Sequence, residues 1–113
     1  MGVQVEHHVE VRPDEDGVRV IVCVGEFDQD TLEPLRTSGA RAASDPDVRR
    51  IVLDVSQVAF ADSSMLNEML FLLRTGRLVL AGPLPPQLSR LLDLTQARDL
   101  FPIADSVEAA SSL

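Results

Sequence analysis

The sequence predicts one α/β domain in which helices pack on a central, mostly parallel β-sheet. Apolar runs of strand length alternate with segments of helical periodicity, in the order β-β-α-β-α-β-α-(β)-α. Strands that alternate with helices are expected to be parallel neighbours joined by right-handed crossovers. The 113 residues are enough for one hydrophobic core, and no repeat or linker divides them. We therefore expect a single domain over residues 1–113, with four or five strands and about four helices.

The first two strands are predicted to form an antiparallel hairpin. Residues 3–11 alternate between apolar and polar side chains except at His7, and the same period places His7 on the buried face and His8 on the solvent face. The turn PDEDG, residues 13–17, leads into a second strand over residues 18–24. Adjacent strand residues point to opposite faces, so the two histidines cannot chelate one metal ion together.

The remaining elements follow from capping residues and apolar runs. Asp30 and Glu33 form a predicted capping box at the start of a helix that ends near Ser44. Residues 51–55 form a nearly continuous apolar run, which is typical of a strand covered on both faces. The later predicted elements are a helix over about 63–75, a strand at 78–81, a helix over 85–94, a short strand near 101–103, a helix from about Asp105, and a frayed tail over 109–113.

Composition narrows the class of partner. The chain has 10 Lys and Arg against 18 Asp and Glu, a net charge of −8, which disfavours nucleic acid and anionic membranes as partners. The only cysteine, Cys23, lies in an apolar run and is predicted to be a buried, inert thiol. We expect no metal and no cofactor. The sequence shows no leader peptide and no apolar stretch of about 20 residues, so we expect a cytoplasmic protein.

Common enzyme signatures are not found in the sequence. It contains no G-x-S-x-G elbow, no glycine-rich phosphate loop and no H-E-x-x-H motif. A nucleophilic serine needs a base and an orienting group, and nothing in the sequence places either beside Ser63 or Ser64. We therefore expect a non-enzymatic protein, with hydrolysis by one of these serines as the alternative from another class.

The helix after the serines has an apolar face and a polar face. With steps of about 100° per residue, the face predicted to pack on the sheet consists of Leu66, Met69, Leu70 and Leu73, with Met65 and Leu72 on its flank. The opposite face holds Ser64, Asn67, Glu68 and Phe71, with Ser63 and Arg74 beside them. Phe71 is an apolar residue among polar ones, so it is a lone exposed Phe without a role, a residue covered by a neighbouring element, or an aromatic anchor for a partner.

The start of this helix admits two interpretations. Asp62, Ser63 and Ser64 are all good N-cap residues, and capping alone would explain them. A helix N-terminus is also a favourable place for phosphate, and a phosphoserine there adds about −1.5 to −2 charges. The effect of that charge would fall on whatever docks against this end of the helix.

The same region resembles a known family. Residues 52–66, VLDVSQVAFADSSML, are similar to the central motif of STAS domains of bacterial anti-sigma factor antagonists, where D-L-S-x-V is followed by x-F-x-D-S-S-G-L. Further similar segments, in the same order, are GEFD at 25–28, LVLAG at 78–82 with PQLSRLL at 86–92, and LFPIADSVEAA at 100–110. The resemblance covers about residues 18–112 and implies a STAS-like fold.

The resemblance implies a partner switch. In the family, the antagonist binds an anti-sigma factor that is also a serine kinase, the kinase phosphorylates the serine after the Asp, and a serine phosphatase resets the cycle. By motif position that serine is Ser63, with Ser64 as the alternative. The implied partner-binding residues are Asp28, Asp62, Ser63 and Ser64, and the helix analysis adds Met65, Asn67 and Phe71. Asp54 also matches a family position, where a structural role at the strand end is the other interpretation.

Three departures from the family pattern bear on this interpretation. Met65 replaces the glycine after the second serine, and Asn67 replaces a small residue. Glycine permits close approach of another backbone, whereas methionine blocks that approach or offers an adaptable apolar contact. The linker at 74–77 is also short. The second hypothesis is therefore a STAS subunit that docks on a transporter ATPase or a stress-signalling complex without a phosphorylation cycle.

Overall fold

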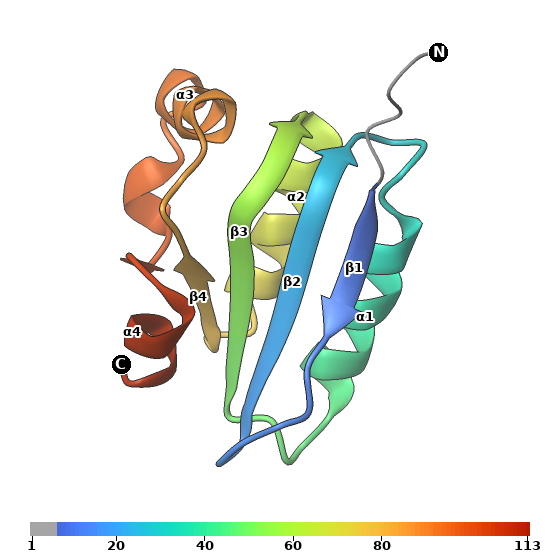
Figure 1. The fold of residues 1–113 in the computed structure, drawn as a ribbon, viewed down its shortest axis with the longest axis vertical. Helices are drawn as coiled ribbons and strands as arrows, with labels where there is room; N and C mark the ends of the chain where they lie inside the picture. Colours follow the sequence, from blue (N-terminus) through green and yellow to red (C-terminus); the bar gives the residue numbers. More distant parts are fainter. Residues whose placement is uncertain (1–6) are drawn as a thin grey trace.

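The computed structural model describes residues 7–113 and confirms the predicted α/β domain (Figure 1). One sheet has the strand order β1-β2-β3-β4-β5, in which β1 is antiparallel to β2 and the other neighbouring strands are parallel. The strands are β1 (His8–Val11), β2 (Val18–Phe27), β3 (Arg50–Ala61), β4 (Leu78–Ala81) and β5 (Ile103–Ala104).

Helices cover the two faces of the sheet unequally. The helices are α1 (Glu33–Ser44), α2 (Ser63–Leu73), α3 (Pro86–Leu94) and α4 (Val107–Ser111), with a short 3-10 helix, η1 (Arg98–Leu100), before β5. Helices α1 and α2 lie behind the strands in Figure 1, whereas the short α4 packs on the other face against β3, β4 and β5. The order of elements matches the prediction, with η1 in addition.

Buried side chains form a cluster on each face of the sheet. The larger cluster joins the sheet to α1, α2 and α3 and includes Ile21, Phe27, Leu35, Leu53, Val58, Ala61, Met65, Met69, Leu88 and Leu92. The smaller one lies towards α4 and includes Val18, Val20, Val22, Val52, Val79, Ala81 and Ala110. Cys23 is buried in the larger cluster, as predicted, and its burial raises the pKa of the thiol.

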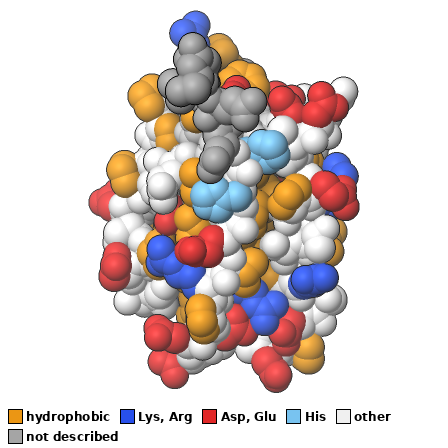
Figure 2. Space-filling model, turned by 45° about the vertical axis from the view of Figure 1, so that its right-hand side comes forward, with side chains coloured by type: hydrophobic (Ala, Val, Ile, Leu, Met, Phe, Trp, Pro, Cys, Tyr) orange, Lys and Arg blue, Asp and Glu red, His pale blue; other side chains and the backbone are white. Residues whose placement is uncertain are grey.

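The N-terminal hairpin is present, but fewer residues of its first strand are buried than predicted. Strand β1 pairs with β2 from His8 opposite Val24 to Val11 opposite Ile21. The prediction that His7 is a core histidine is wrong, since both His7 and His8 are exposed, and Figure 2 shows the pale blue side chains at the surface. The reason is that β1 is the edge strand, where even Val11 is exposed. Residues 3–6 of the predicted strand lie outside the described residues.

The predicted capping box of α1 is wrong. The helix begins at Glu33 with Leu32 at the N-cap position and no capping side chain. The carboxylate that organises this loop belongs to Asp28, whose Oδ1 accepts hydrogen bonds from the backbone N–H of Asp30 (2.9 Å) and of Thr31 (3.1 Å). Asp28 therefore shapes the chain between β2 and α1, and Asp30, which was predicted as the N-cap, donates its backbone N–H to Asp28 instead.

Strand β3 extends beyond the predicted residues 51–55 to Ala61 and carries two register shifts against β2. In each shift β3 has one residue more than its partner, the pattern of a β-bulge. At the first, Asp54 is buried and its Oδ1 accepts hydrogen bonds from the Ser56 N–H (3.0 Å) and hydroxyl (2.7 Å). Asp54 thus has a structural role.

Strand β2 ends at Phe27, three residues beyond the predicted Val24, and the boundaries after β3 differ from the prediction by at most two residues. Helix α2 ends at Leu73 rather than Thr75, α3 begins at Pro86, and β5 lies at 103–104. We expected the chain to fray from Ala109, but residues 107–111 form α4 and Ala110 is fully buried. Across residues 7–113, no helix is long and apolar enough to cross a membrane, and no three His, Cys, Asp or Glu side chains are grouped to hold a metal ion.

Candidate functional site

The two serines lie in the first turn of α2, beside the carboxyl ends of strands β2 and β3. Asp62 is the N-cap: its Oδ1 accepts hydrogen bonds from the backbone N–H of Ser64 (2.8 Å) and Met65 (3.4 Å). Of the three residues predicted as possible N-caps, Asp62 is the one that caps the helix. The hydroxyl groups of Ser63 and Ser64 therefore do not cap it.

Ser63 and Ser64 differ in accessibility. Ser63 is exposed and Ser64 is partly buried. Within residues 7–113, neither hydroxyl has a hydrogen-bond partner, so neither is bound to a histidine or carboxylate that would activate it as a nucleophile. The arrangement gives no support to hydrolysis. Of the two hydroxyls, that of Ser63 is the more accessible to an external phosphate donor.

The backbone just before the serines is fixed from two sides. The N–H of Asp62 donates to the carbonyl of Phe27 at the end of β2 (3.3 Å). On the other side, Ala61 donates its N–H to Oε1 of Gln87 (2.8 Å), and Nε2 of Gln87 donates to the carbonyl of Ala61 (2.8 Å). The last β3–β4 pair joins Asp54 and Ala81, so here the side chain of α3 replaces a neighbouring strand.

Gln87 is a residue of this site that the sequence did not predict. Its neighbours in the sequence carry no motif for this contact, because the contact depends on how α3 is placed against the free edge of β3. No local signal was available to find it.

Asp28 lies in the loop after β2, one residue beyond the contact between β2 and the start of α2. Its neighbour Phe27 is bonded to Asp62, which brings the loop after β2 against the start of α2. Asp28 is partly buried, and one of its oxygens is engaged by the N–H groups of Asp30 and Thr31. Its established contacts are therefore those that hold the loop.

The outward face of α2 forms a stripe that starts at Ser63. Ser63, Asn67 and Phe71 are four residues apart and all exposed, so they line one side of the helix. Phe71 is 44% exposed, which excludes the interpretation that another element covers it. At 1.5 Å per residue, the stripe from Ser63 to Phe71 is about 12 Å long.

The buried face of α2 is rotated from the prediction. Met65, Met69 and Leu72 are fully buried, whereas Leu70 and Leu73 are only partly buried. Met65, predicted as a partner contact, points into the core and offers no docking surface, nor does it block one. Helical spacing fixes the angles between side chains but not which arc meets the sheet.

The prediction that Glu68 lies on the polar face of α2, away from the core, is wrong. Its side chain is buried against α1, where Oε1 has no hydrogen-bond partner within residues 7–113. A Cβ added at Gly39 would lie 3.2 Å from that oxygen, so the absence of a side chain at Gly39 makes room for the carboxyl group. Burial raises the pKa of Glu68, Arg36 opposes the shift and Glu33 adds to it.

Phe60 is a second exposed aromatic that sequence analysis missed. It is 39% exposed and stands three residues before Ser63. Simple alternation would bury it with Val58, but the second register shift of β3 leaves Ala59 and Phe60 both exposed between buried Val58 and Ala61. A bulge re-aims side chains in this way, and the sequence carries no clear signal for it.

The segments around the serines are acidic. Residues 20–35 and 51–73 contain no Lys or Arg. The loop after β2 carries Glu26, Asp28 and Asp30, and Asp62 lies beside it. The next cation along the chain, Arg36, donates a hydrogen bond to Glu33 (2.9 Å). This end of the molecule therefore favours a partner surface with basic side chains.

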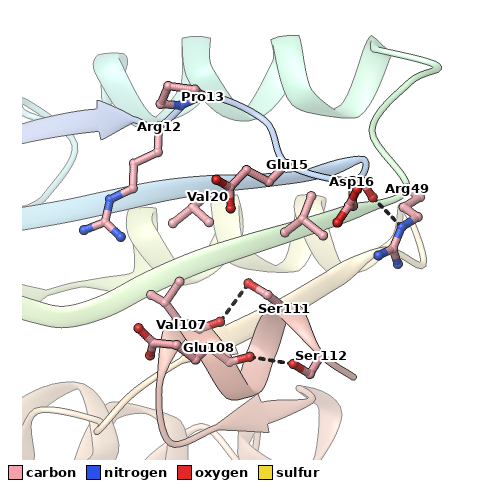
Figure 3. A pocket seen from close by; sticks show the side chains of 11 residues that line it. Arg12, Pro13, Glu15, Asp16, Val20, Arg49, Val107, Glu108, Ser111 and Ser112 are labelled. Atoms are coloured by element: carbon pink, nitrogen blue, oxygen red, sulfur yellow. Dashed lines mark hydrogen bonds between the residues drawn. The ribbon is translucent and has the colours of Figure 1, made fainter.

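A cavity of about 580 Å³ lies away from this site, between the hairpin turn and α4 (Figure 3). Val18 and Val20 form part of its wall, near the start of β2, whereas the serines follow the far end of β3. Its two arginines, Arg12 and Arg49, are accompanied by Glu15, Asp16 and Glu108. None of the predicted site residues lines it.

Comparisons with known proteins agree on the family. The family model described as "Mlab, STAS domain" matches residues 11–102. An anti-sigma factor antagonist from Mycobacterium paratuberculosis has a TM-score of 0.84 at 22% identity, with 99% of this chain and 97% of that chain covered. SpoIIAA, an anti-sigma factor antagonist, gives 0.74 at 22% identity in its unphosphorylated form, with 92% and 94% covered. Bacillus SpoIIAA in the phosphorylated form gives 0.69 at 21% identity, with 92% and 97% covered.

At these identities the solved structures establish a shared fold, and the family model matches most of the sequence. The sequence match and the fold together show that the chain belongs to the STAS-domain family.

Proposed function

We propose that this chain is an anti-sigma factor antagonist that is switched off by phosphorylation of Ser63. In the cytoplasm it binds an anti-sigma factor with serine-kinase activity, and a serine phosphatase restores the binding form. The observation that carries the proposal is the separation of cap and hydroxyl: Asp62 caps α2, and the adjacent Ser63 is exposed with an unbonded hydroxyl within residues 7–113.

The neighbourhood of Ser63 explains why a phosphate would eject the partner. Asp62 already accepts hydrogen bonds from the first free N–H groups of α2, so a phosphate would meet a carboxylate where a helix start usually offers donors. An added charge of about −1.5 to −2 that is desolvated beside other anions weakens docking.

The proposed docking surface is the exposed stripe of α2 and the loop beside it. Its members are Asp28, Asp62, Ser63, Ser64, Asn67 and Phe71. Met65 is left out because its side chain is fully buried. Phe71 supplies an aromatic contact about two helical turns from Ser63, a spacing that a single docked surface can span.

The relatives support a phosphorylation cycle on this fold. SpoIIAA has been solved in unphosphorylated and phosphorylated forms, and both resemble this chain. A phosphate is therefore compatible with the STAS fold in that protein. For this chain the cycle is our inference, made from the position and exposure of Ser63.

A second candidate is a STAS subunit that docks on a transporter ATPase or a stress-signalling complex through the same helix without phosphorylation. The exposed Phe71 favours it, since an apolar anchor serves a constitutive interface as well as a switchable one. Affinity capture separates the candidates, because only the first predicts a sigma-regulatory kinase among the bound proteins.

The test of the first candidate uses a purified anti-sigma kinase and three variants. Ser63→Ala should bind the kinase as wild type does but accept no phosphate, and Ser63→Asp should bind at least about tenfold more weakly. Ser64→Ala is the matched control and should still be phosphorylated. Phosphate transfer to Ser63→Ala at the wild-type rate would show that Ser63 is not the site.

A further inference from the structure

We propose that Phe60 is an apolar anchor that extends the docking surface from Ser63 onto the face of the sheet beyond α4, for a kinase surface with an apolar pocket and a basic rim. This inference rests on the proposed function and deepens it. It assigns a partner contact to a residue outside the stripe of α2.

Strand register shows which way Phe60 points. Phe60 is paired with Glu26, and Ala61 with Phe27, on the parallel strands β3 and β2. Residues paired in a parallel sheet point to the same face, and successive residues to opposite faces. Phe27 and Ala61 are buried in the cluster beneath α1 and α2, so Glu26 and Phe60 point to the other face.

That other face is only partly covered. Helix α4 packs on it near the start of β3, where Arg50 donates a hydrogen bond to the carbonyl of Ala110 (3.3 Å). Figure 1 shows α4 towards the opposite end of the sheet from the tip of β3. The side chains at the tip of β3 remain accessible, with Ala59 and Phe60 both exposed.

The backbone that carries Phe60 is held in place. Its neighbour Ala61 is bonded to Gln87 on one side and pairs with Phe27 on the other. An aromatic side chain on a fixed backbone loses little conformational freedom when it docks, which is the property of an anchor residue. Phe60 therefore combines an exposed side chain with a backbone that is held by strand pairing.

Charge indicates the chemistry of the occupant. Exposed Glu26 lies beside Phe60 across the strand pair, and Asp28, Asp30 and Asp62 surround the same end of the sheet. Residues 20–35 and 51–73 contribute no cation to neutralise them. A partner that covers Phe60 must meet these carboxylates, so Lys or Arg around its pocket would give a complementary surface.

The test compares Phe60→Ala with Leu94→Ala for binding to a purified anti-sigma kinase that phosphorylates wild type. Leu94 is 72% exposed at the end of α3 and serves as the matched control, since its truncation also removes exposed apolar area. We expect Phe60→Ala to raise the Kd about tenfold or more and Leu94→Ala to leave it within about twofold. Thermal unfolding should show both variants folded.

A charge variant tests the rim. Glu26→Gln should lower the association rate and reduce its dependence on salt, because one carboxylate is removed from the encounter surface. If the association rate of Glu26→Gln and its salt dependence equal those of wild type, the proposal that basic side chains surround the pocket of the partner is wrong.

Failure of the anchor and failure of the proposed function give different results. If the kinase binds wild type and rejects Ser63→Asp, yet binds Phe60→Ala as tightly as Leu94→Ala, the anchor is wrong and the proposed function stands. If no anti-sigma kinase binds or phosphorylates wild type, both are overturned.

Discussion

The side-chain amide of Gln87 pairs with the main chain of Ala61 through two hydrogen bonds of 2.8 Å each, one in each direction. The pair occupies the edge of β3 beyond the end of β4, where the strand would otherwise present unpaired N–H and C=O groups. Because Ala61 immediately precedes the N-cap of α2, α3 is tied directly to the segment that holds Ser63.

Replacing Gln87 tests this tie. Gln87→Ala removes both hydrogen bonds and should lower the free energy of unfolding by about 1–3 kcal/mol, measured by urea denaturation. Hydrogen exchange at the Ala61 amide should become faster. Arg90→Ala, an exposed change on the same helix, is the control and should alter neither quantity. Unchanged exchange at Ala61 in Gln87→Ala would show that the pair does not protect this edge.

Substitutions of Asp62 are expected to lower the stability of the domain, whereas Ser63→Ala is expected to leave it unchanged. Asp62→Ala removes the N-cap of α2 and should cost about 1 kcal/mol of stability, whereas Asp62→Asn keeps an accepting oxygen and should cost less. Ser63→Ala should leave thermal unfolding unchanged, since its hydroxyl has no partner within residues 7–113. A loss of stability in Ser63→Ala as large as that in Asp62→Ala would contradict this division of roles.

Met65 gives a prediction opposite to the one that the family motif suggests. Replacing it with the family's glycine would leave a cavity at a fully buried site and lower the helix propensity. Met65→Gly should therefore lower the free energy of unfolding by more than the about 2–5 kcal/mol that is typical of a buried Met→Ala change. Met65→Leu, of similar volume, should lose less than about 1.5 kcal/mol. Urea denaturation of the two variants measures the difference. Near-equal stability of Met65→Gly and wild type would mean that the site collapses without cost.

The sequence predicts the order of elements, the parallel core and the position of α2, because each depends on periodicity and local capping residues. The length of β3 was underestimated because its two bulges break the alternation after Val55. Bulges and edge contacts, such as those around Phe60 and Gln87, are set by neighbours distant in sequence. These are the parts of the site that sequence analysis missed.

Which residue caps α2 also could not be predicted from the sequence alone. Sequence gives three equivalent caps in Asp62, Ser63 and Ser64, and only the turn geometry assigns the cap to Asp62. The buried face of α2 likewise depends on α1, which covers Glu68. Conversely, Ser63, Asn67 and Phe71 were predicted on the polar side of α2, and all three are exposed there, although the sequence left open whether another element covers Phe71.

Glu68 should make the stability of the domain depend on pH. Burial raises the folded-state pKa of this carboxyl group above its value in the unfolded chain, so the folded state binds the proton more tightly. As pH rises from the ordinary Glu pKa of about 4.3 through the raised value, the unfolded state releases its proton first and stability falls. Above the raised value the loss is constant.

Glu68→Gln removes this titration while keeping the shape of the side chain. The variant should therefore be more stable than wild type at neutral pH, and the difference should shrink towards zero below about pH 4. Urea denaturation at a series of pH values measures it, with exposed Glu108→Gln as the matched control that should show little difference. If wild type were instead the more stable protein at neutral pH, the fold would have to stabilise the charged form of Glu68. That result would contradict the raised pKa and the lack of a hydrogen-bond partner for the buried Oε1 among residues 7–113.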